Sequence, residues 1–519
     1  MLKRASPTLL AICLAAGTAA AGALGPEWSD LRSPAWRDLR TAVVQEALPL
    51  HVLTFGAPLR RELARSLDPI LVREPGSSAR RRLERELAEE LRLRRGEASP
   101  GAGAPWVDRE LDPGRLRLRP TLDLAARWNE GTPPGWTDGP RLGLDGTLHL
   151  DSRVTLAQHL FVGRVPGGRR FADALVAHTD LLLLFESAFA GYASDRLELR
   201  AGRFRQAYGP GRSGGLLLSP DAAPIDQIEY ALRGRSLRFR AMYGVLSAAT
   251  DRRVAMHRLE WSPSERWLLG LSEGAAFQGG GAPNLYLLGF VPYTLVERVQ
   301  GQDAVEPGGV DSVRNNVLWQ LDATFRSARA GLFWSSLLLD DVATESSAMP
   351  SRLGLQLGWE LAPRTRGWQL AVEAVKVWNY TYSVFYQSIC PCDWVHQGTA
   401  IGYPGGPDLE QVELSLEQSV SEADAVEFRL LRQSKGEGRL GDPWIPAPVL
   451  GDRPTSSDAS RLSGTVEQIL RLECAYRHEP FGGLASRVGI AARWAENEGN
   501  LGAPWRLGWE TTVRLSAHR

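Results

Sequence analysis

A serine flanked by glycines is the first residue pattern in this chain that could do chemistry. Residues 211–215 read Gly-Arg-Ser-Gly-Gly, which matches the spacing of the nucleophile elbow that hydrolases use. That motif works only on a strand-to-helix turn, with a histidine and an acid positioned beside the serine. The flanks contain Pro210 and Pro220 and do not predict a helix. We therefore interpret the motif as a glycine-rich loop, and a hydrolase that uses Ser213 is the weakest of three functional hypotheses.

Carboxylates, histidines and cysteines form no catalytic or metal-binding pattern. Asp340 and Asp341 are adjacent on an expected strand, so their side chains point to opposite faces and do not form an acid–base pair. The 8 histidines stand at no ligand spacing from one another or from a cysteine cluster. Cys390 and Cys392 lack the two-residue spacer of a zinc or redox pair, so we interpret them as a loop disulfide or as free thiols. We expect no metal, no cofactor and no enzymatic activity, and an outward-facing Cys474.

The stretch from residue 378 to residue 408 is the densest aromatic and polar cluster. Aromatic faces stack on the apolar C–H patches of a sugar, while carboxylate, amide and imidazole groups bond to its hydroxyls. We therefore expect polysaccharide contacts here, with Arg212 as a partner for acidic sugars. The expected contacts are Trp378, Tyr380, Tyr382, Tyr386, Trp394, His396 and Asp408. An aromatic girdle combined with an ordered outer loop explains the same residues equally well.

The elements that would position these residues follow a period of two from about residue 115 onward. In residues 115–128, leucines and Trp128 share one face, while Arg115, Arg117 and Asp123 share the other. The core of a soluble β-sandwich or propeller could not bury this repeated charge unpaired, whereas a wet barrel lumen can hold it. Runs of about ten residues suit tilted membrane-crossing strands. We therefore predict an all-β transmembrane barrel of about 18 antiparallel strands over residues 114–519.

The first hundred residues differ from the rest. A positive start, an apolar stretch and a small-residue cleavage site predict a signal peptide over residues 1–25, and a lipoprotein signal at Cys13 is the weaker alternative. Residues 26–100 follow a helical period, with Pro34 opening the first candidate helix and residues 79–95 forming the last. We therefore expect a small periplasmic α-helical module before the barrel.

Composition excludes two classes of partner. The 60 basic and 60 acidic residues give zero formal charge, which favours neither nucleic acid nor a polybasic membrane anchor. The longest apolar run after the predicted signal, residues 181–185, is too short to cross a bilayer as a helix. The 17 tryptophans suit a protein with two membrane interfaces.

Several short blocks also occur in a characteristic order. They are Tyr208 to Gly211 with residues 216–224, His257 to Glu260 with residues 269–273, Asn315 and Asn316 with Asp322, Asp340 with Asp341, and Tyr386 through His396 to Asp408. This order, over about residues 200–410, resembles the Wzi-type capsule-assembly proteins of the outer membrane. The resemblance implies a barrel of about 18 strands, a helical periplasmic module and a role in attaching or organising surface polysaccharide without chemistry. Two features depart from it: residues 513–519 lack a terminal aromatic, and the loop of Cys390 and Cys392 is unusual.

Three functional hypotheses follow. The first is an exported, monomeric outer-membrane barrel, surrounded by lipid, that binds capsular or exopolysaccharide and assists its assembly or attachment, with periplasmic or export-machinery proteins as further partners. The second is a porin-like diffusion channel for small polar solutes or sugars, because a barrel of this size can leave an aqueous pore. The third is the Ser213 hydrolase. None of the three involves nucleic acid.

Overall fold

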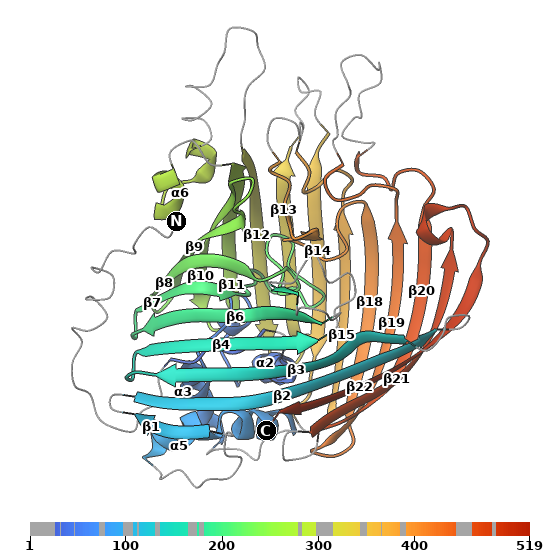
Figure 1. The fold of residues 1–519 in the computed structure, drawn as a ribbon. Coiled ribbons are helices and arrows are strands. Elements are labelled where there is room, and N and C mark those ends of the chain that lie inside the picture. The colour runs from blue at the N-terminus through green and yellow to red at the C-terminus, as the bar shows by residue number, and fades with distance from the viewer. Residues whose placement is uncertain are drawn as a thin grey trace.

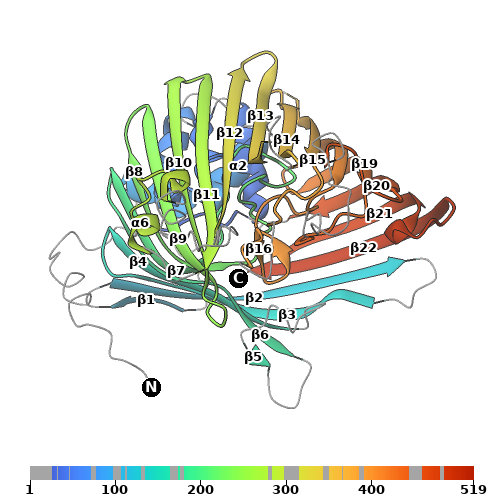
Figure 2. The same ribbon diagram turned by 90° about the horizontal axis from the view of Figure 1, so that it is seen from above.

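The alternating segments form one antiparallel sheet that closes on itself (Figures 1 and 2). The computed structural model describes residues 26–31, 33–45, 47–71, 78–96, 107–111, 114–129, 135–163, 174–175, 181–278, 283–296, 315–342, 350–364, 366–384, 391–442, 459–479 and 484–518. Within these ranges the sheet has 20 strands, of which 18 form the ring, because β1 and β5 only add short pairings to β2 and β6. The pairing of β2 with β22 closes the ring. The predicted barrel of about 18 strands is therefore confirmed.

The strands are listed here with their bounds. They are β1 Val107–Leu111, β2 Gly114–Asn129, β3 Gly135–His149, β4 Val154–Gly163, β5 Ala174–Leu175, β6 Leu182–Ala193, β7 Leu197–Phe204, β8 Ile225–Arg233, β9 Leu237–Ser247, β10 Arg252–Ser264, β11 Trp267–Gln278, β12 Asn315–Ser327, β13 Gly331–Asp341, β14 Arg352–Leu361, β15 Trp368–Val377, β18 Leu409–Ser419, β19 Asp424–Lys435, β20 Glu467–His478, β21 Leu484–Glu496 and β22 Arg506–His518. A separate two-stranded hairpin consists of β16 Val395–His396 and β17 Thr399–Ala400.

The wall of the barrel has an apolar outer face and a polar inner face. On β11, Leu269 and Leu271 are exposed to the outside, whereas the side chains between and beside them are buried. The same alternation on β20 places Cys474 between the exposed Leu472 and Tyr476, so its outward orientation is confirmed, and its thiol is free. An apolar outer face is what lipid requires of a barrel strand.

The connections at the two ends of the barrel differ in length. At one end three-residue turns join strands, as at residues 194–196 between β6 and β7 and residues 328–330 between β12 and β13. At the other end, residues 205–224 join β7 to β8 and residues 378–408 join β15 to β18. Outer-membrane barrels have short periplasmic turns and longer extracellular loops. The short-turn end is therefore periplasmic.

A helical module lies at this periplasmic end, inside the ring of strands (Figure 1). Its helices are α2 Pro34–Val44, η1 Leu50–Val52, α3 Arg60–Leu71, α4 Ser78–Glu86 and α5 Ala88–Arg95; α6 Pro283–Leu288 and η3 Glu498–Asn500 lie elsewhere. Pro34 opens α2 behind the N-cap Ser33, whereas the single helix predicted over residues 79–95 is two helices separated at Leu87. Gly96, at φ +72°, ends α5 in the left-handed conformation that glycine adopts readily.

The hydrophobic core of the module is continuous with the barrel. Leu39, Val43 and Leu63 pack in one buried cluster with the inward-facing Leu268 and Trp334 of the wall. In the described part of the chain, no helix has the length and apolar character needed to cross a membrane. The predicted signal over residues 1–25 lies outside the described residues.

Candidate functional site

Two extracellular segments fold back into the lumen and pack on each other. They are residues 205–224 and residues 378–408, and we call their described parts the extracellular plug. Plug side chains share one buried cluster with inward-facing strand residues. The cluster contains Tyr208, Leu216, Leu217, Leu218, Tyr382, Trp394, Ile401 and Tyr403 from the plug and Met242, Met256, Leu318, Leu338 and Val375 from the strands. Because protein interiors pack closely, this cluster fills the part of the lumen that lies along the wall from β8 to β15.

Hydrogen bonds hold the two segments of the plug together. The indole nitrogen Nε1 of Trp394 donates to the carbonyl of Leu217 at 2.7 Å, and the Tyr382 hydroxyl donates to the carbonyl of Leu216 at 2.6 Å. The Ser219 amide donates to the carbonyl of Ile401 at 2.9 Å. Burial raises the pKa of Tyr382, which keeps its hydroxyl protonated as a donor. An unmade bond at a buried group costs about 1–3 kcal/mol, so these contacts favour the inward position of the plug.

Asp340 attaches the plug to the wall. Its Oδ2 accepts from the backbone amide of Tyr382 at 2.7 Å, and its Oδ1 lies 3.6 Å from Arg352. Arg352 also contacts Asp341. The two aspartates point to opposite faces of β13, as expected, and both contact Arg352. The inward-facing Asp340 also holds a plug residue.

Asp408 attaches the plug to a neighbouring loop. It has φ +58° and accepts from the Gly438 amide at 2.8 Å and from the Ser463 hydroxyl at 2.5 Å. Gly438 and Ser463 lie in the connection between β19 and β20. Its carboxylate is buried and engaged by these donors, which supports a structural role in joining extracellular loops.

The glycine-rich motif lies within the plug and lacks the geometry of a nucleophile elbow. No helix follows Ser213 between residues 214 and 224. The Ser213 hydroxyl contacts the Glu373 carboxylate and lies 3.0 Å from the Tyr403 hydroxyl, and these are its polar side-chain partners within the described ranges. The backbone amides of Arg212 and Ser213 donate to the same carboxylate at 2.8 Å each. The interpretation as a glycine-rich loop is therefore confirmed.

The structure separates the predicted sugar contacts into buried and accessible residues. Those buried in the plug are Tyr382, Trp394, His396 and Asp408. Trp378 and Tyr380 are half-buried, and Trp378 continues the outward phase of β15, as a girdle residue would. Arg212 lies in the lumen with Nη1 3.4 Å from Glu360, and Tyr386 lies outside the described residues. Sugar contact by these residues stays a prediction, and the four buried ones pack the plug.

The helical module lies in the lumen at the periplasmic end and bonds to the wall. Arg326 of β12 donates to the carbonyls of Val43 at 2.9 Å and Leu48 at 2.6 Å. From the module, Arg61 donates to the carbonyl of Ser194 at 3.3 Å, in the turn between β6 and β7. The module is therefore bonded to well-separated parts of the ring.

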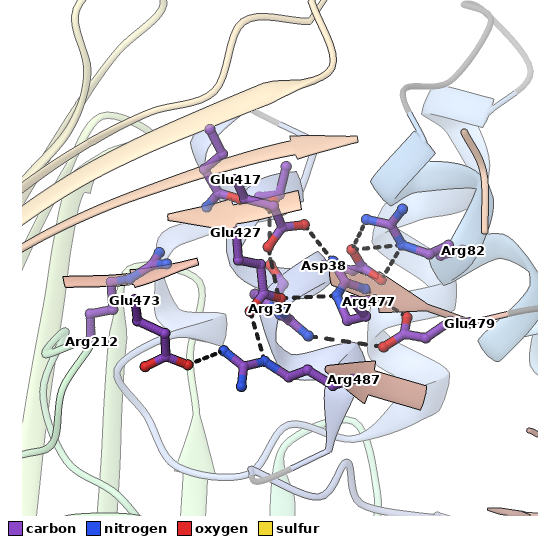
Figure 3. Close-up of polar contacts among 12 residues, drawn as sticks. Arg37, Asp38, Arg82, Arg212, Glu417, Glu427, Glu473, Arg477, Glu479 and Arg487 are labelled. Atoms are coloured by element: carbon purple, nitrogen blue, oxygen red, sulfur yellow. Dashed lines mark hydrogen bonds and ion pairs between the residues drawn. The ribbon is translucent and has the colours of Figure 1, made fainter. Parts of the chain in front are cut away.

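Charged side chains of the lumen surround one arginine of the module (Figure 3). Arg37 on α2 contacts Glu427 and lies 3.4 Å from Glu417. Both glutamates also bind Arg477, at 3.0 and 2.6 Å, and Glu427 binds Arg487 at 3.0 Å. Burial alone would lower the pKa of Arg37, but Glu417 and Glu427 outweigh it and raise the pKa, so Arg37 stays charged. The charged residues on the inner face of the strands thus bind the helical module through a network of ion pairs.

The module and the extracellular plug touch each other. Arg40 on α2 pairs with Glu360 at 2.5 Å and donates to the Pro210 carbonyl at 2.9 Å. The Gly209 amide donates to the Thr54 carbonyl at 3.3 Å. Module and plug are therefore in direct contact inside the lumen. Sequence reasoning missed this, although three successive leucines at residues 216–218, inside a glycine- and proline-rich loop, are a signal for a buried loop.

An apolar outer wall and a charged lumen that holds a helical module and an extracellular plug define an outer-membrane β-barrel, and the protein is located in the outer membrane. A family model described as capsule assembly protein Wzi matches residues 178–500. The chain belongs to this capsule-assembly family, which confirms the resemblance drawn from the short blocks.

Two solved structures are similar to this chain to different degrees. One is the Escherichia coli outer membrane protein Wzi, described as a carbohydrate-binding β-barrel involved in group 1 capsule assembly. It is 14% identical, covers 95% of this chain and 99% of its own, and superposes with a TM-score of 0.60, which shows a shared fold. Pseudomonas aeruginosa OccK2 in complex with glucuronate is 11% identical, covers 78% of this chain and 97% of its own, and has a TM-score of 0.44. No curated protein sequence matches the chain.

Proposed function

We propose that this protein binds capsular or exopolysaccharide at its extracellular face, without catalysing a reaction, and so helps to hold or assemble that polysaccharide on the cell surface. The observation that carries the proposal is the inward folding of the extracellular plug, as far as its residues are described. Folded into the barrel, the plug gives the extracellular end a packed support for a binding surface. Membership of the capsule-assembly family supports the same function.

The plug and the helical module inside the barrel favour polysaccharide binding over the diffusion-channel hypothesis. A channel needs a continuous aqueous path, and both the buried plug side chains of Leu216, Trp394 and Tyr382 and the module at the level below narrow that path. We therefore expect no steady conductance steps when the purified protein is placed in planar bilayers. Stable open steps would instead favour the channel hypothesis.

Accessible aromatic side chains at the extracellular end are the proposed sugar contacts. Tyr380 lies in the plug, is partly exposed and has φ +63°. Trp505, in the connection between β21 and β22, is 51% exposed. Their rings can stack on sugar C–H faces. The buried Trp394 and Asp408 would act indirectly, by holding the loops that present this surface.

Binding of the host's own polysaccharide tests the proposal. The full-length mature protein in nanodiscs is titrated with that polysaccharide, alongside the Tyr380→Ala and Trp505→Ala variants. Trp261→Ala serves as the control, because Trp261 is 50% exposed on the outward face of β10. A lost aromatic stacking contact of about 0.5–1.5 kcal/mol predicts affinity weaker by roughly twofold to tenfold in the two loop variants and unchanged in the control. Absence of binding by the unmodified protein would overturn the proposal.

A further inference from the structure

A segment between β11 and β12 lies against the outside of the barrel. Residues 283–296 read PNLYLLGFVPYTLV and contain no charged residue. They include α6, beside β8 and β9 in Figure 1, and a helical turn at residues 293–296. Tyr286, Tyr293 and Val296 of this segment pack on Ala255 of β10 and Phe277 of β11. We call residues 283–296 the outer segment.

The outer segment covers a carboxylate on the lipid-facing side of the wall. Along β11, Glu273 shares the outward phase of Leu269 and Leu271, yet its side chain is fully buried. Its two oxygens accept from the amides of Tyr293 at 2.7 Å and Thr294 at 2.8 Å, and from the Thr294 hydroxyl at 2.6 Å.

A histidine completes this polar cluster. Nε2 of His257 lies 3.2 Å from Glu273, and His257 also occupies an outward position, on β10. Asn315, outward on β12, donates to the Tyr286 hydroxyl at 3.0 Å. An uncovered carboxylate on a lipid-facing strand is costly, so the segment and Glu273 satisfy each other. His257 and Glu273 belong to the short sequence blocks at residues 257–260 and 269–273, and the barrel fold alone gives no reason for polar residues at these two outward positions.

The face of the outer segment that points away from the wall is apolar and exposed. Leu287, Leu288, Phe290 and Leu295 are 45%, 54%, 63% and 52% exposed. The patch is continuous with the lipid-facing wall, because the Phe290 ring stacks on Phe239 of β9 at a centroid distance of 4.9 Å. Ile228 of β8, on the outward face of the next strand, is also 57% exposed.

The depth of the segment fits the membrane. Glu273 lies five positions before Gln278, the extracellular end of β11. At about 3.3 Å per residue and a strand tilt of about 40°, this places the carboxylate roughly 13 Å below that end. The apolar belt of an outer-membrane barrel is about 25 Å tall. The uncharged outer segment therefore reaches into the level that lipid occupies.

We propose that the outer segment is a lipid-immersed latch: it inserts Leu287, Leu288, Phe290 and Leu295 among the acyl chains of the outer leaflet and is held to the wall by Glu273. Lipid is favoured as the occupant because the segment lacks charge and extends the lipid-facing wall without a break. A second copy of this chain on the same patch is the alternative that the test must distinguish.

Spin labels test the immersion. Leu288→Cys and Phe290→Cys are labelled in a Cys474→Ser background and reconstituted in proteoliposomes, and collisions with oxygen and with a nickel chelate are compared. Leu271→Cys on the wall is the lipid reference, and Leu501→Cys, 83% exposed at the extracellular end, is the water reference. We expect both segment labels to match Leu271, with high oxygen and low nickel accessibility. Labels that match Leu501, or that show dipolar broadening between copies, would overturn the proposal.

The same labels test the latch. With a label at Phe290, Glu273→Ala should release the segment and sharpen the spectrum, and Thr294→Val, which removes one donor, should do so to a smaller extent. Thr294→Val keeps the test decisive if Glu273→Ala does not fold. Asp251→Asn is the matched control, because Asp251 pairs with Arg253 in the turn between β9 and β10. Unchanged label mobility in Thr294→Val and in any folded Glu273→Ala protein would refute the role of Glu273.

Discussion

Replacing Trp394 by alanine should loosen the extracellular plug while leaving the barrel intact. Trp394 is fully buried, and its Nε1 satisfies the Leu217 carbonyl. Truncating a buried tryptophan costs about 3–5 kcal/mol through lost burial and the cavity left behind. Each 1.4 kcal/mol changes an equilibrium tenfold, so local opening of the plug should become more frequent by roughly 10²- to 10⁴-fold.

Hydrogen exchange measures this opening directly. The amides of Tyr208 and Ser219 are bonded inside the plug, to Leu218 and Ile401, so they exchange only when it opens. In detergent, Trp394→Ala should lose protection across residues 205–224 by the factor given above, whereas β-strand amides should stay protected. Tyr382→Phe, which removes one hydroxyl, should change exchange about twofold to tenfold.

A surface tryptophan provides the control for this exchange experiment. Trp261→Ala should leave the plug amides unchanged, because Trp261 lies on the outside of the barrel. Exchange in Trp394→Ala that stays within twofold of the unmodified protein would refute the assignment of Trp394 as the main support of the plug. Loss of protection throughout the strands would contradict the claim that the plug opens as a separate unit.

Three further predictions concern the module and the motif. Arg37→Met leaves Glu417 and Glu427 without one counter-charge and should destabilise the docking of the module by about 1–3 kcal/mol. The loss should appear as a lower melting temperature of the helical circular-dichroism signal at 222 nm. Arg85→Met is the control, because Arg85 forms a partly exposed ion pair whose loss should cost under about 1 kcal/mol. Burial, and after it nearby arginines, lowers the pKa of His51 well below 6.5. The unfolded chain therefore protonates His51 at a higher pH than the folded chain does, so docking of the module should weaken as the pH falls below about 6.5. His51→Gln should reduce that loss of stability. A serine-reactive probe should not label Ser213, and stoichiometric labelling abolished by Ser213→Ala would contradict its structural role.

The barrel could be predicted from sequence because its signal is local. On β2 and β11 each residue alternates between lipid and lumen, so a period of two, with charge on one face, is visible within ten residues. The outward position of Cys474 followed from the same periodicity. The start of the helix at Pro34 could also be predicted, because the preference of proline for the first helical position depends on the local backbone and not on contacts elsewhere in the chain.

The filling of the lumen could not be predicted in the same way. Trp394 and Leu217 are 177 residues apart in sequence, and nothing near either residue indicates that their loops fold inward together. An aromatic loop on the surface and one inside a barrel have the same composition. The outer segment was missed because a loop of 14 uncharged residues has no strand-like period, and its contact with Glu273 exists only after the barrel forms.

We propose that this barrel retains polysaccharide at the cell surface and does not conduct solutes. The most direct test is deletion of the gene in its host, followed by measurement of polysaccharide on the cells and in the culture medium. We expect polysaccharide to be produced still but to shift from the cells to the medium, and we expect the unmodified gene to restore its attachment. An unchanged amount of cell-bound polysaccharide in the deletion strain would show that the protein does not retain it.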